Sequence, residues 1–335
     1  MNDGFQVIVP REVPLGGPRA MTVRRTLPAR ERSFVGAWCF VDHYGPDDVA
    51  ESGGMDVAPH PHCGLATVSW LFSGEVEHRD SLGTVAVVRP GEVNLMTAGR
   101  GISHSEVSTG GTSLLHGAQL WLVLPEAVAD VEPRFEHHEP EVLAVAPGVR
   151  AQVFVGSMWG STSPVRVESP LVGAEVVLEA GSAVHVPVAE GFEVSVLVDT
   201  GSVTLEGRDL ARAELGVVPA WRQPGPVLLV AGRHGARVLV LGGEPFGEDV
   251  VMWWNFIGRS HEEVAQAREA WEAETSSEAE EAGTRGGGAG RFGRVDGYAG
   301  PVSRIPAPAL PGVRLKARGN RETSGFSGAE ANAMS

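Results

Sequence analysis

The stretch GMDVAPHPHCGLATVSWLFSG, residues 54–74, indicates both a fold class and a site. Pro59 and Pro61 keep the chain extended around two histidines, and the apolar and small residues that follow suit a buried β-strand. In an extended chain, residues i and i+2 point to the same face, so His60 and His62 can converge on one ion. The stretch therefore predicts a β-strand that carries a histidine pair.

The rest of the chain repeats this pattern of short strands and turns. Runs rich in Val and Leu, bounded by Gly, Pro, Asp or Ser, recur at intervals of roughly ten residues. They include 67–72, 85–88, 120–124, 153–155, 176–178, 194–198, 227–230 and 238–241. Such spacing is typical of an antiparallel sandwich or barrel and not of alternating strand and helix units. We therefore predict an all-β protein.

Residues 259–275 are the exception and predict a helix. Ser260 is suited to cap it, with Glu263 three residues later as in a capping box. Val264, Ala267 and Trp271 share one face, which indicates that the helix docks on the β body. Beyond it, residues 276–335 are rich first in Glu, Ser and Gly and then in Pro, and they predict a flexible linker and an extended tail.

A second polar pair lies 42 residues after the first, in His104-Ser105-Glu106. Two such pairs on neighbouring strands would supply three imidazoles and one carboxylate to one ion. A single His-x-His pair is commonly a surface feature, but two pairs in one β unit favour a metal site. This ligand set suits a divalent transition metal, with Fe(II) placed first and Ni, Cu, Mn, Co and Zn left open. Four protein ligands on an octahedral ion leave two positions for water, O2 or a chelating substrate.

Four other polar residues have candidate roles outside the proposed ligand set. Asp42 and His43 fit either an outer layer that supports the ligands or the cap of a turn. His78 and Asp80 stand beside a predicted hairpin turn and are interpreted as structural.

Four further residues bear on where a pocket or a second metal site could lie. Gln119 and Trp121 share a strand face that can line a pocket. In the second half, His185 and His234 stand alone, so we expect no metal there.

The composition limits the classes of partner. The chain of 335 residues carries 27 basic and 42 acidic residues, a net charge of −15, which argues against a nucleic-acid surface over most of the molecule. The basic residues of 312–321 are expected to fold back on the acidic body, so we expect no stable nucleic-acid binding. No apolar run of 18 residues occurs, and no charged segment followed by an apolar stretch opens the chain, so we expect a cytoplasmic protein without membrane contact.

Cys39 and Cys63 are the two cysteines, and both are expected to be free thiols. Alternation along the strand turns Cys63 away from His62, so we interpret it as a packed side chain and not a ligand.

These motifs resemble a known family. The pattern Gly54-x5-His60-x-His62-x11-Gly74 resembles the first cupin motif. A longer set of motifs resembles the pirins: FVDHYGP at 40–46, HPH at 60–62, HRDS at 78–81, MTAGRGI at 96–102 and HSE at 104–106. The resemblance implies a bicupin, in which two jelly-roll or β-barrel domains lie face to face. Residues 1–130 would form the metal-binding cupin, and residues 131–258 a second cupin without metal.

The resemblance also implies site residues and an activity. In pirins the iron ligands match His60, His62, His104 and Glu106. The implied activity is that of a quercetin 2,3-dioxygenase, an oxidoreductase whose substrate chelates the metal through adjacent hydroxyl and carbonyl oxygens. Glu106 would then be the catalytic group that accepts the hydroxyl proton. One departure is Ala66, where many pirins carry Glu or Gln, so a proton-handling role at that position is lost.

Two alternatives remain open at the level of sequence. The first is a non-catalytic, metal- and redox-dependent regulator that acts by binding a protein partner. The second is a structural or lectin-like bicupin without stoichiometric metal. The substrate, the native metal, the oligomeric state and the identity of any partner are not specified by the sequence.

Overall fold

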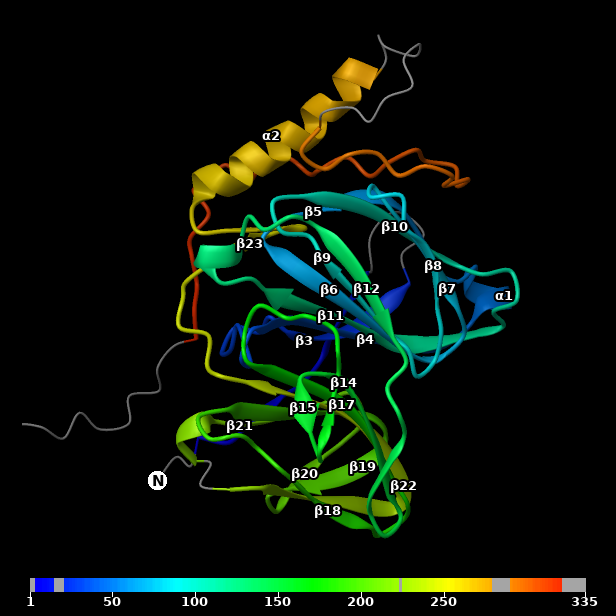
Figure 1. The fold of residues 1–335 in the computed structure, drawn as a ribbon, viewed down its shortest axis with the longest axis vertical. Coiled ribbons are helices and arrows are strands. Elements are labelled where there is room, and N and C mark those ends of the chain that lie inside the picture. The colour runs from blue at the N-terminus through cyan, green and yellow to red at the C-terminus, as the bar shows by residue number, and fades with distance from the viewer. Residues whose placement is uncertain (1–3, 15–20, 223–224, 279–289, 321–335) are drawn as a thin grey trace, which may run out of the picture.

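The computed structural model describes residues 4–14, 21–222, 225–278 and 290–320, and its strands form two β-barrel domains, one above the other in Figure 1. The prediction of an all-β protein with a C-terminal helix is confirmed. None of the helices in the described ranges is long and apolar enough to cross a membrane.

The first barrel is built from two antiparallel sheets. The larger has seven strands in the order β12 (Arg134–His138), β9 (Val93–Thr97), β6 (Leu65–Ser73), β11 (Leu114–Val123), β4 (Trp38–Asp48), β3 (Thr22–Leu27) and β2 (Arg11–Pro14). The smaller has four strands in the order β5 (Asp56–His62), β10 (Ile102–Ser108), β7 (Val76–Asp80) and β8 (Val85–Val88). The strand predicted around His60 is therefore β5, and it lies at the edge of the smaller sheet.

The second barrel is one nine-stranded sheet. Its main path runs β1 (Gln6–Ile8), β21 (Leu215–Val218), β19 (Glu193–Leu205), β22 (Val227–Gly243), β17 (Leu171–Leu178), β14 (Val149–Val155) and β13 (Leu143–Ala146). Two further strands pair outside this path: β18 (Ala183–Val186) with β22, and β20 (Arg208–Leu210) with β19.

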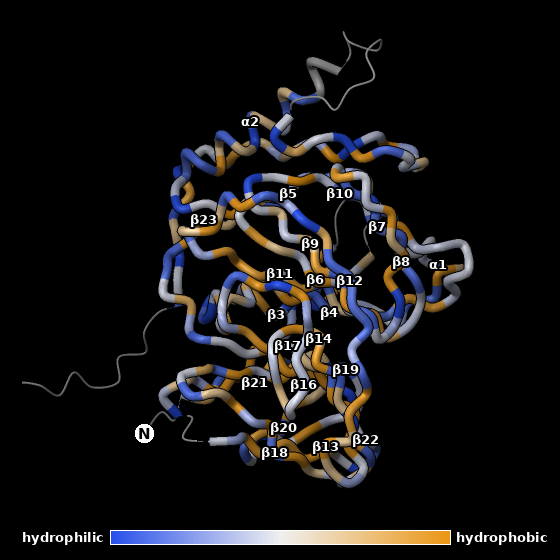
Figure 2. Tube along the Cα trace, viewed as in Figure 1, coloured by the Kyte–Doolittle hydropathy of each residue, from blue (hydrophilic) through white to orange (hydrophobic). Residues whose placement is uncertain are grey.

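Short elements connect and flank the barrels. Two small hairpins are formed by β15 (Ser157–Met158) with β16 (Ser161–Thr162), and by β23 (Val251–Trp253) with β24 (Phe256–Gly258). The helices are α1 (Val49–Ser52), the single 3₁₀ turns η1 (Glu126–Val128) and η2 (Ala220–Arg222), and α2 (His261–Glu278). In Figure 2, apolar residues concentrate in the strands of both barrels, whereas α2 mixes apolar and hydrophilic positions.

The strand pairing differs from the predicted division of the chain at residue 130. β12 lies beyond that point and adds to the first barrel by pairing with β9, whereas β1 at the start of the chain pairs with β21 in the second barrel. Alternating hydrophobicity identifies strands but carries no information about their partners, so these two pairings do not follow from the sequence pattern.

The predicted helix begins where expected but is longer than predicted. The Ser260 hydroxyl accepts a hydrogen bond from the Glu263 backbone N–H at 3.2 Å, as a cap does. The helix continues to Glu278 because Ser and Thr are only weakly unfavourable within a helix, and no Gly or Pro occurs before Gly283. Of the predicted linker and tail, residues 279–289 and 321–335 lie outside the described residues.

The basic stretch near the C-terminus lies against the protein, as predicted for the part that the structure describes. Arg314 forms an ion pair with Glu262 of α2, and the backbone N–H of Leu315 donates to His261 Nδ1 at 3.1 Å. Arg318 pairs with Val250 through two backbone hydrogen bonds. Arg321 lies outside the described residues.

A continuous apolar core joins the two barrels. On β11, Leu120 and Leu122 point into this core, while Gln119 and Trp121 point into the interior of the first barrel. In this core, the outer face of the seven-stranded sheet packs against strands of the second barrel. The second barrel therefore covers the back of the first barrel's larger sheet.

Trp38 on β4 is a central residue of this interface. It is fully buried, and its indole Nε1–H donates to the carbonyl oxygens of Val172 and Gly242 in the second barrel, each at 3.2 Å. A buried indole that is also hydrogen-bonded contributes both packing and polar pairing across the interface.

We expect Trp38→Ala to lower the free energy of unfolding by about 3–5 kcal/mol, because it removes a large buried ring and leaves two carbonyl oxygens without their donor. Denaturant titration followed by circular dichroism measures the change. Trp221→Ala is the matched control, since Trp221 is 65% exposed, and it should change stability by less than about 0.5 kcal/mol. Equal effects of the two variants would contradict this assignment of the interface.

Candidate metal centre

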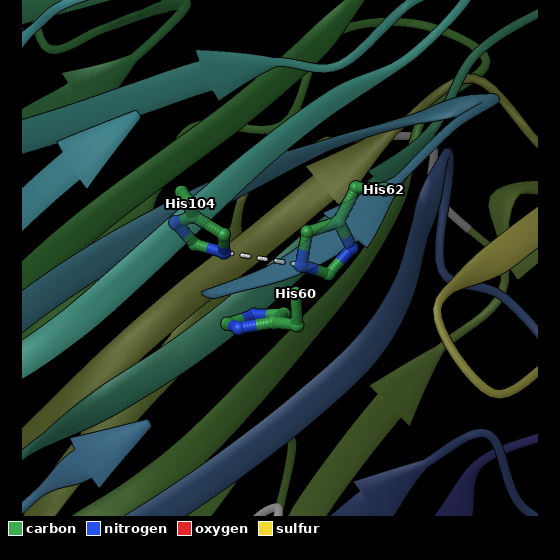
Figure 3. A group of neighbouring side chains, drawn as sticks. All are labelled: His60, His62 and His104. Atoms are coloured by element: carbon green, nitrogen blue, oxygen red, sulfur yellow. Dashed lines mark hydrogen bonds between the residues drawn. The ribbon is translucent and has the colours of Figure 1, made fainter. Parts of the chain in front are cut away.

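Three histidines of the first barrel converge inside it. β5 pairs antiparallel with β10 so that His60 stands opposite His104, and His62 follows on the same face of β5. The ligand nitrogens of the three residues all lie within 4.8 Å of one another, and all three side chains are buried. Figure 3 shows the rings turned toward one another, with His62 Nε2 and His104 Nε2 3.1 Å apart.

Hydrogen bonds on the far side of the rings determine which nitrogens carry lone pairs. His60 Nδ1 lies 2.9 Å from the Ala58 carbonyl oxygen, which only accepts, so Nδ1 carries the proton and Nε2 is left as a lone pair. His78 Nε2 lies 3.1 Å from the Asp80 carboxylate, and its Nδ1 lies 3.3 Å from His104 Nδ1. In the neutral form, His78 donates to Asp80 and accepts from His104, which leaves His104 Nε2 as a lone pair.

Burial keeps the imidazoles neutral. It lowers the pKa of His60 to about 4, and it lowers the pKa values of His62 and His104 well below the ordinary value, with neighbouring histidines adding to the effect. Neutral imidazole is the form that binds a metal ion. Three buried, neutral imidazoles that lie side by side are therefore suited to a divalent transition metal at neutral pH.

Glu106 lines the same cavity as His60 and His62. Its carboxylate is not among the ligand atoms that lie within 4.8 Å of one another. A register shift in the pairing of β10 with β5 falls between His104 and Glu106. The carboxylate Oε1 of Glu106 lies 3.4 Å from the hydroxyl of Ser69 on β6. Burial raises the pKa of the Glu106 carboxyl group, while His78 and Ser69 act in the opposite direction. The structure thus brings three of the four predicted ligands together and places the fourth beside them.

His60 and His62 line a cavity of about 440 Å³ with aromatic walls. Phe40 and Trp121 are stacked with ring centroids 4.1 Å apart, and the Trp121 ring also meets the His62 ring edge-on at 5.1 Å. Met252 and Trp254 of the hairpin β23–β24 line the cavity as well. This shape suits a flat, partly aromatic molecule.

Comparisons with known proteins agree with this architecture. The profile of the Pirin family matches residues 20–122, and that of the pirin C-terminal cupin domain matches residues 173–276. A Pseudomonas aeruginosa protein, provisionally named a quercetin 2,3-dioxygenase, is 41% identical over 307 residues, which cover 92% of this chain and 91% of that protein. This chain belongs to the pirin family. The predicted bicupin fold is confirmed.

Solved structures show the same fold. The crystal structure of a quercetin 2,3-dioxygenase from Acinetobacter baumannii superposes with a TM-score of 0.82 at 35% identity, covering 93% of this chain and 97% of that one. A bacterial pirin from Escherichia coli, solved in complex with nickel(II), matches with a TM-score of 0.56 at 20% identity over 72% of this chain and all of that one. The second likeness concerns the fold alone.

Several residues of this pirin's cavity were not found by sequence reasoning. The predicted pocket residues Gln119 and Trp121 line the cavity, but Met252, Trp254 and Asn255 were missed. These three lie in a short hairpin beyond the second barrel, where neither a periodic pattern nor a motif indicated a site. The aromatic pair at 253–254 was the available signal.

His78 and Asp80 have a larger role than the structural one predicted. His78 contacts the ligand candidate His104 directly, and Asp80 holds the other side of the His78 ring. Asp80 thus contacts His78, and His78 contacts His104. Such a series of hydrogen bonds, from a carboxylate through an imidazole to a ligand, orients metal-binding histidines in proteins. The His-x-Asp spacing on one strand face was the signal for it.

The interpretation that His43 and Asp42 support the ligands is wrong: the Asp42 carboxylate pairs with Arg25 Nε at 2.6 Å, and His43 belongs to another group. His43 forms a second buried group with His116 and with Asp199 of the second barrel. Arg24 Nε donates to His43 Nδ1 at 3.1 Å, so the proton of His43 is on Nε2, which donates to Asp199 Oδ1 at 2.7 Å. A nitrogen that carries a proton cannot bind a metal, and this group is therefore a hydrogen-bonded link between the barrels.

Three further predictions concern side chains near the motifs. Ala66 pairs with Leu122 on the face of β6 that points away from Ser69, so a carboxylate at this position would not face the histidines of this pirin.

Cys39 and Cys63 are free and buried, as predicted, and burial raises the pKa of the Cys63 thiol to about 11. Both lone histidines of the second barrel, at 185 and 234, are exposed.

We expect the metal-free protein to lose stability as the pH falls from about 6.5 to about 4. In this window the unfolded chain binds a proton at His60, whose pKa there is about 6.5, while the folded chain does not, because its pKa is about 4. The free energy of unfolding should fall by up to about 1.4 kcal/mol per pH unit for this residue.

Denaturant titrations at several pH values measure this slope. His60→Gln removes the titrating group and should make the slope shallower by the equivalent of about one proton. His234→Gln, the same substitution at an exposed histidine outside the metal centre, is the matched control. The assignment is wrong if His60→Gln retains the wild-type slope.

Proposed function

We propose that this pirin is a metal-dependent dioxygenase of the quercetin 2,3-dioxygenase type, with iron as its metal. The observation that carries the proposal is the group of three buried, neutral imidazoles beside a buried carboxylate in an aromatic-walled cavity. The names of two close relatives, one of them solved as a crystal structure, point to the same chemistry. We further propose a cytoplasmic location, which suits two unpaired cysteines.

The donor set fits the proposed ion. His60, His62 and His104 would hold it through nitrogen, and Glu106 would complete the set through oxygen. Three imidazoles and one carboxylate match the preferences of Fe(II), and those of Ni, Cu, Mn, Co and Zn to differing degrees. The bound metal would supply Lewis acidity and a redox centre for reaction with O2.

The protein's own groups prepare the substrate. The stacked pair of Phe40 and Trp121 offers a flat wall against which an aromatic enol can lie. Glu106 is proposed to accept the hydroxyl proton of that enol, and burial, which raises the pKa of its carboxyl group, makes it a stronger base. Ser69, whose hydroxyl reaches both Glu106 Oε1 and Gln119 Oε1, positions the carboxylate.

We expect protein loaded anaerobically with Fe(II) to consume O2 and quercetin together. His60→Ala should lower kcat/KM at least a hundredfold and reduce the bound iron, because it removes a ligand. Glu106→Gln should lower kcat more than it lowers iron content if the carboxylate also accepts the proton. Oxygen uptake and metal analysis on each variant measure these effects.

His137→Ala is the control for this experiment, because the His137 side chain is exposed and lies outside the histidine group, so the variant should behave as wild type. Full iron loading of the wild-type protein without flavonol turnover would overturn the dioxygenase proposal and favour the regulatory alternative.

We also expect His78→Phe to weaken metal affinity about tenfold or more, because His104 loses the partner that orients its ring. Phenylalanine preserves the stacking with Phe135, whose centroid lies 4.7 Å from that of His78, so the packing is retained. Competition with a metal-binding dye measures the affinity. His137→Phe is the matched control, and an unchanged affinity in His78→Phe would contradict the assigned role.

A further inference from the structure

The C-terminal strap, residues 290–320, crosses the first barrel at the strand that carries His60 and His62. In Figure 1 its orange part lies beside α2, above β5 and β10, and its red end descends past β23. β5 is an edge strand of its sheet, and the Ile305 backbone N–H donates to the Pro59 carbonyl oxygen at 2.8 Å. Tyr298 Oη also donates to Asp56 Oδ1 at 2.6 Å. The strap therefore covers the open edge of the strand that carries two of the proposed ligands.

The strap is held equally firmly on its outer side by α2. The Trp271 indole Nε1–H donates to the Ile305 carbonyl oxygen at 2.9 Å. The Arg304 guanidinium lies over the Trp271 ring, 3.6 Å from its centroid, and the Ala307 backbone N–H donates to Glu272 Oε1 at 2.7 Å. Both backbone groups of Ile305 are thus occupied, one by β5 and one by α2. The position of this residue is determined from two sides.

The Ile305 side chain faces inward. It lines the cavity that contains His60, His62 and Glu106, and it packs against the apolar cluster that includes Val57 of β5. It is the strap residue that lines this cavity among the described residues. A residue from the end of the chain therefore forms a wall of the site whose proposed ligands lie in the first third.

We propose that Ile305 is a specificity-determining residue, and that the strap limits the size of the molecule that reaches the metal. This inference rests on the proposed function, in that the molecule is an enol that chelates through adjacent hydroxyl and carbonyl oxygens. Because the residue is held at both backbone groups, the wall does not retreat to admit a larger ring. Substitution of its side chain should change the preference for ligand size and leave the chelating step intact.

The experiment compares two probes that share a chelating unit and differ in size. Maltol presents the hydroxyl and carbonyl on one small ring, and 3-hydroxyflavone presents the same unit with two further rings. Binding of each to the full-length protein loaded with Ni(II) is followed under nitrogen, where no O2 is present for turnover, by the absorbance of the bound enolate. The quantity of interest is the ratio of the two dissociation constants.

Ile305→Trp should weaken binding of 3-hydroxyflavone at least tenfold relative to maltol, and Ile305→Ala should shift the ratio severalfold in the opposite direction. Val302→Ala, on the same strap but 45% exposed, should leave the ratio unchanged. Thermal unfolding and nickel content show that each variant is folded and loaded with metal. If Ile305→Ala does not fold or does not bind nickel, Ile305→Val provides a milder substitution.

The outcomes separate the two proposals. A ratio within twofold of wild type in both Ile305→Trp and Ile305→Ala would overturn the role of Ile305 while leaving the proposed function standing. Failure of both probes to bind the nickel-loaded wild-type protein would overturn the proposed function and, with it, the inference about its specificity.

Discussion

The site depends on one pairing, that of β5 with β10, in which His60 stands opposite His104. The side chains of a strand alternate between faces, so a slip of one residue would turn the histidines of β5 out of the barrel. Pro59 and Pro61 have no N–H to donate, which suits β5 to the edge of its sheet. The register is supported on the open side by the Ile305 hydrogen bond, and the geometry of the histidines therefore depends on contacts from both ends of the chain.

The sequence was informative where chemistry follows from local spacing. The i,i+2 rule places His60 and His62 on one face, and the family motifs indicate the bicupin fold. Spacing could not predict which distant segment would complete the cavity. Ile305 and Trp254 belong to regions without a repeating pattern, and their contribution follows from tertiary packing alone. The orientation of His104 by His78 depends in the same way on the pairing of β10 with β7.

The same limit explains why one histidine was misinterpreted. His43 stands in a family motif near the metal ligands in sequence, but its partners come from β3 and from the second barrel. Arg24 contacts His43 at one end of this group, and Arg237 pairs with Asp199 at the other. Hydrogen bonds from His116 and His43, together with the charge of Arg237, lower the pKa of the Asp199 carboxyl group. Only a structure reveals whether a histidine lies beside an arginine or beside other histidines. His43 accepts a hydrogen bond from Arg24 and joins His116 and Asp199, whereas the metal-centre group consists of three histidines.

The position of β1 has a consequence for how the protein is made. This strand is synthesised roughly two hundred residues before its partner β21. Nascent domains tend to fold as they emerge, so the first barrel can close while β1 still waits for its sheet. An N-terminal fusion tag or signal that detains residues 6–8 would thus impair the barrel that is translated last, and leave the earlier one intact.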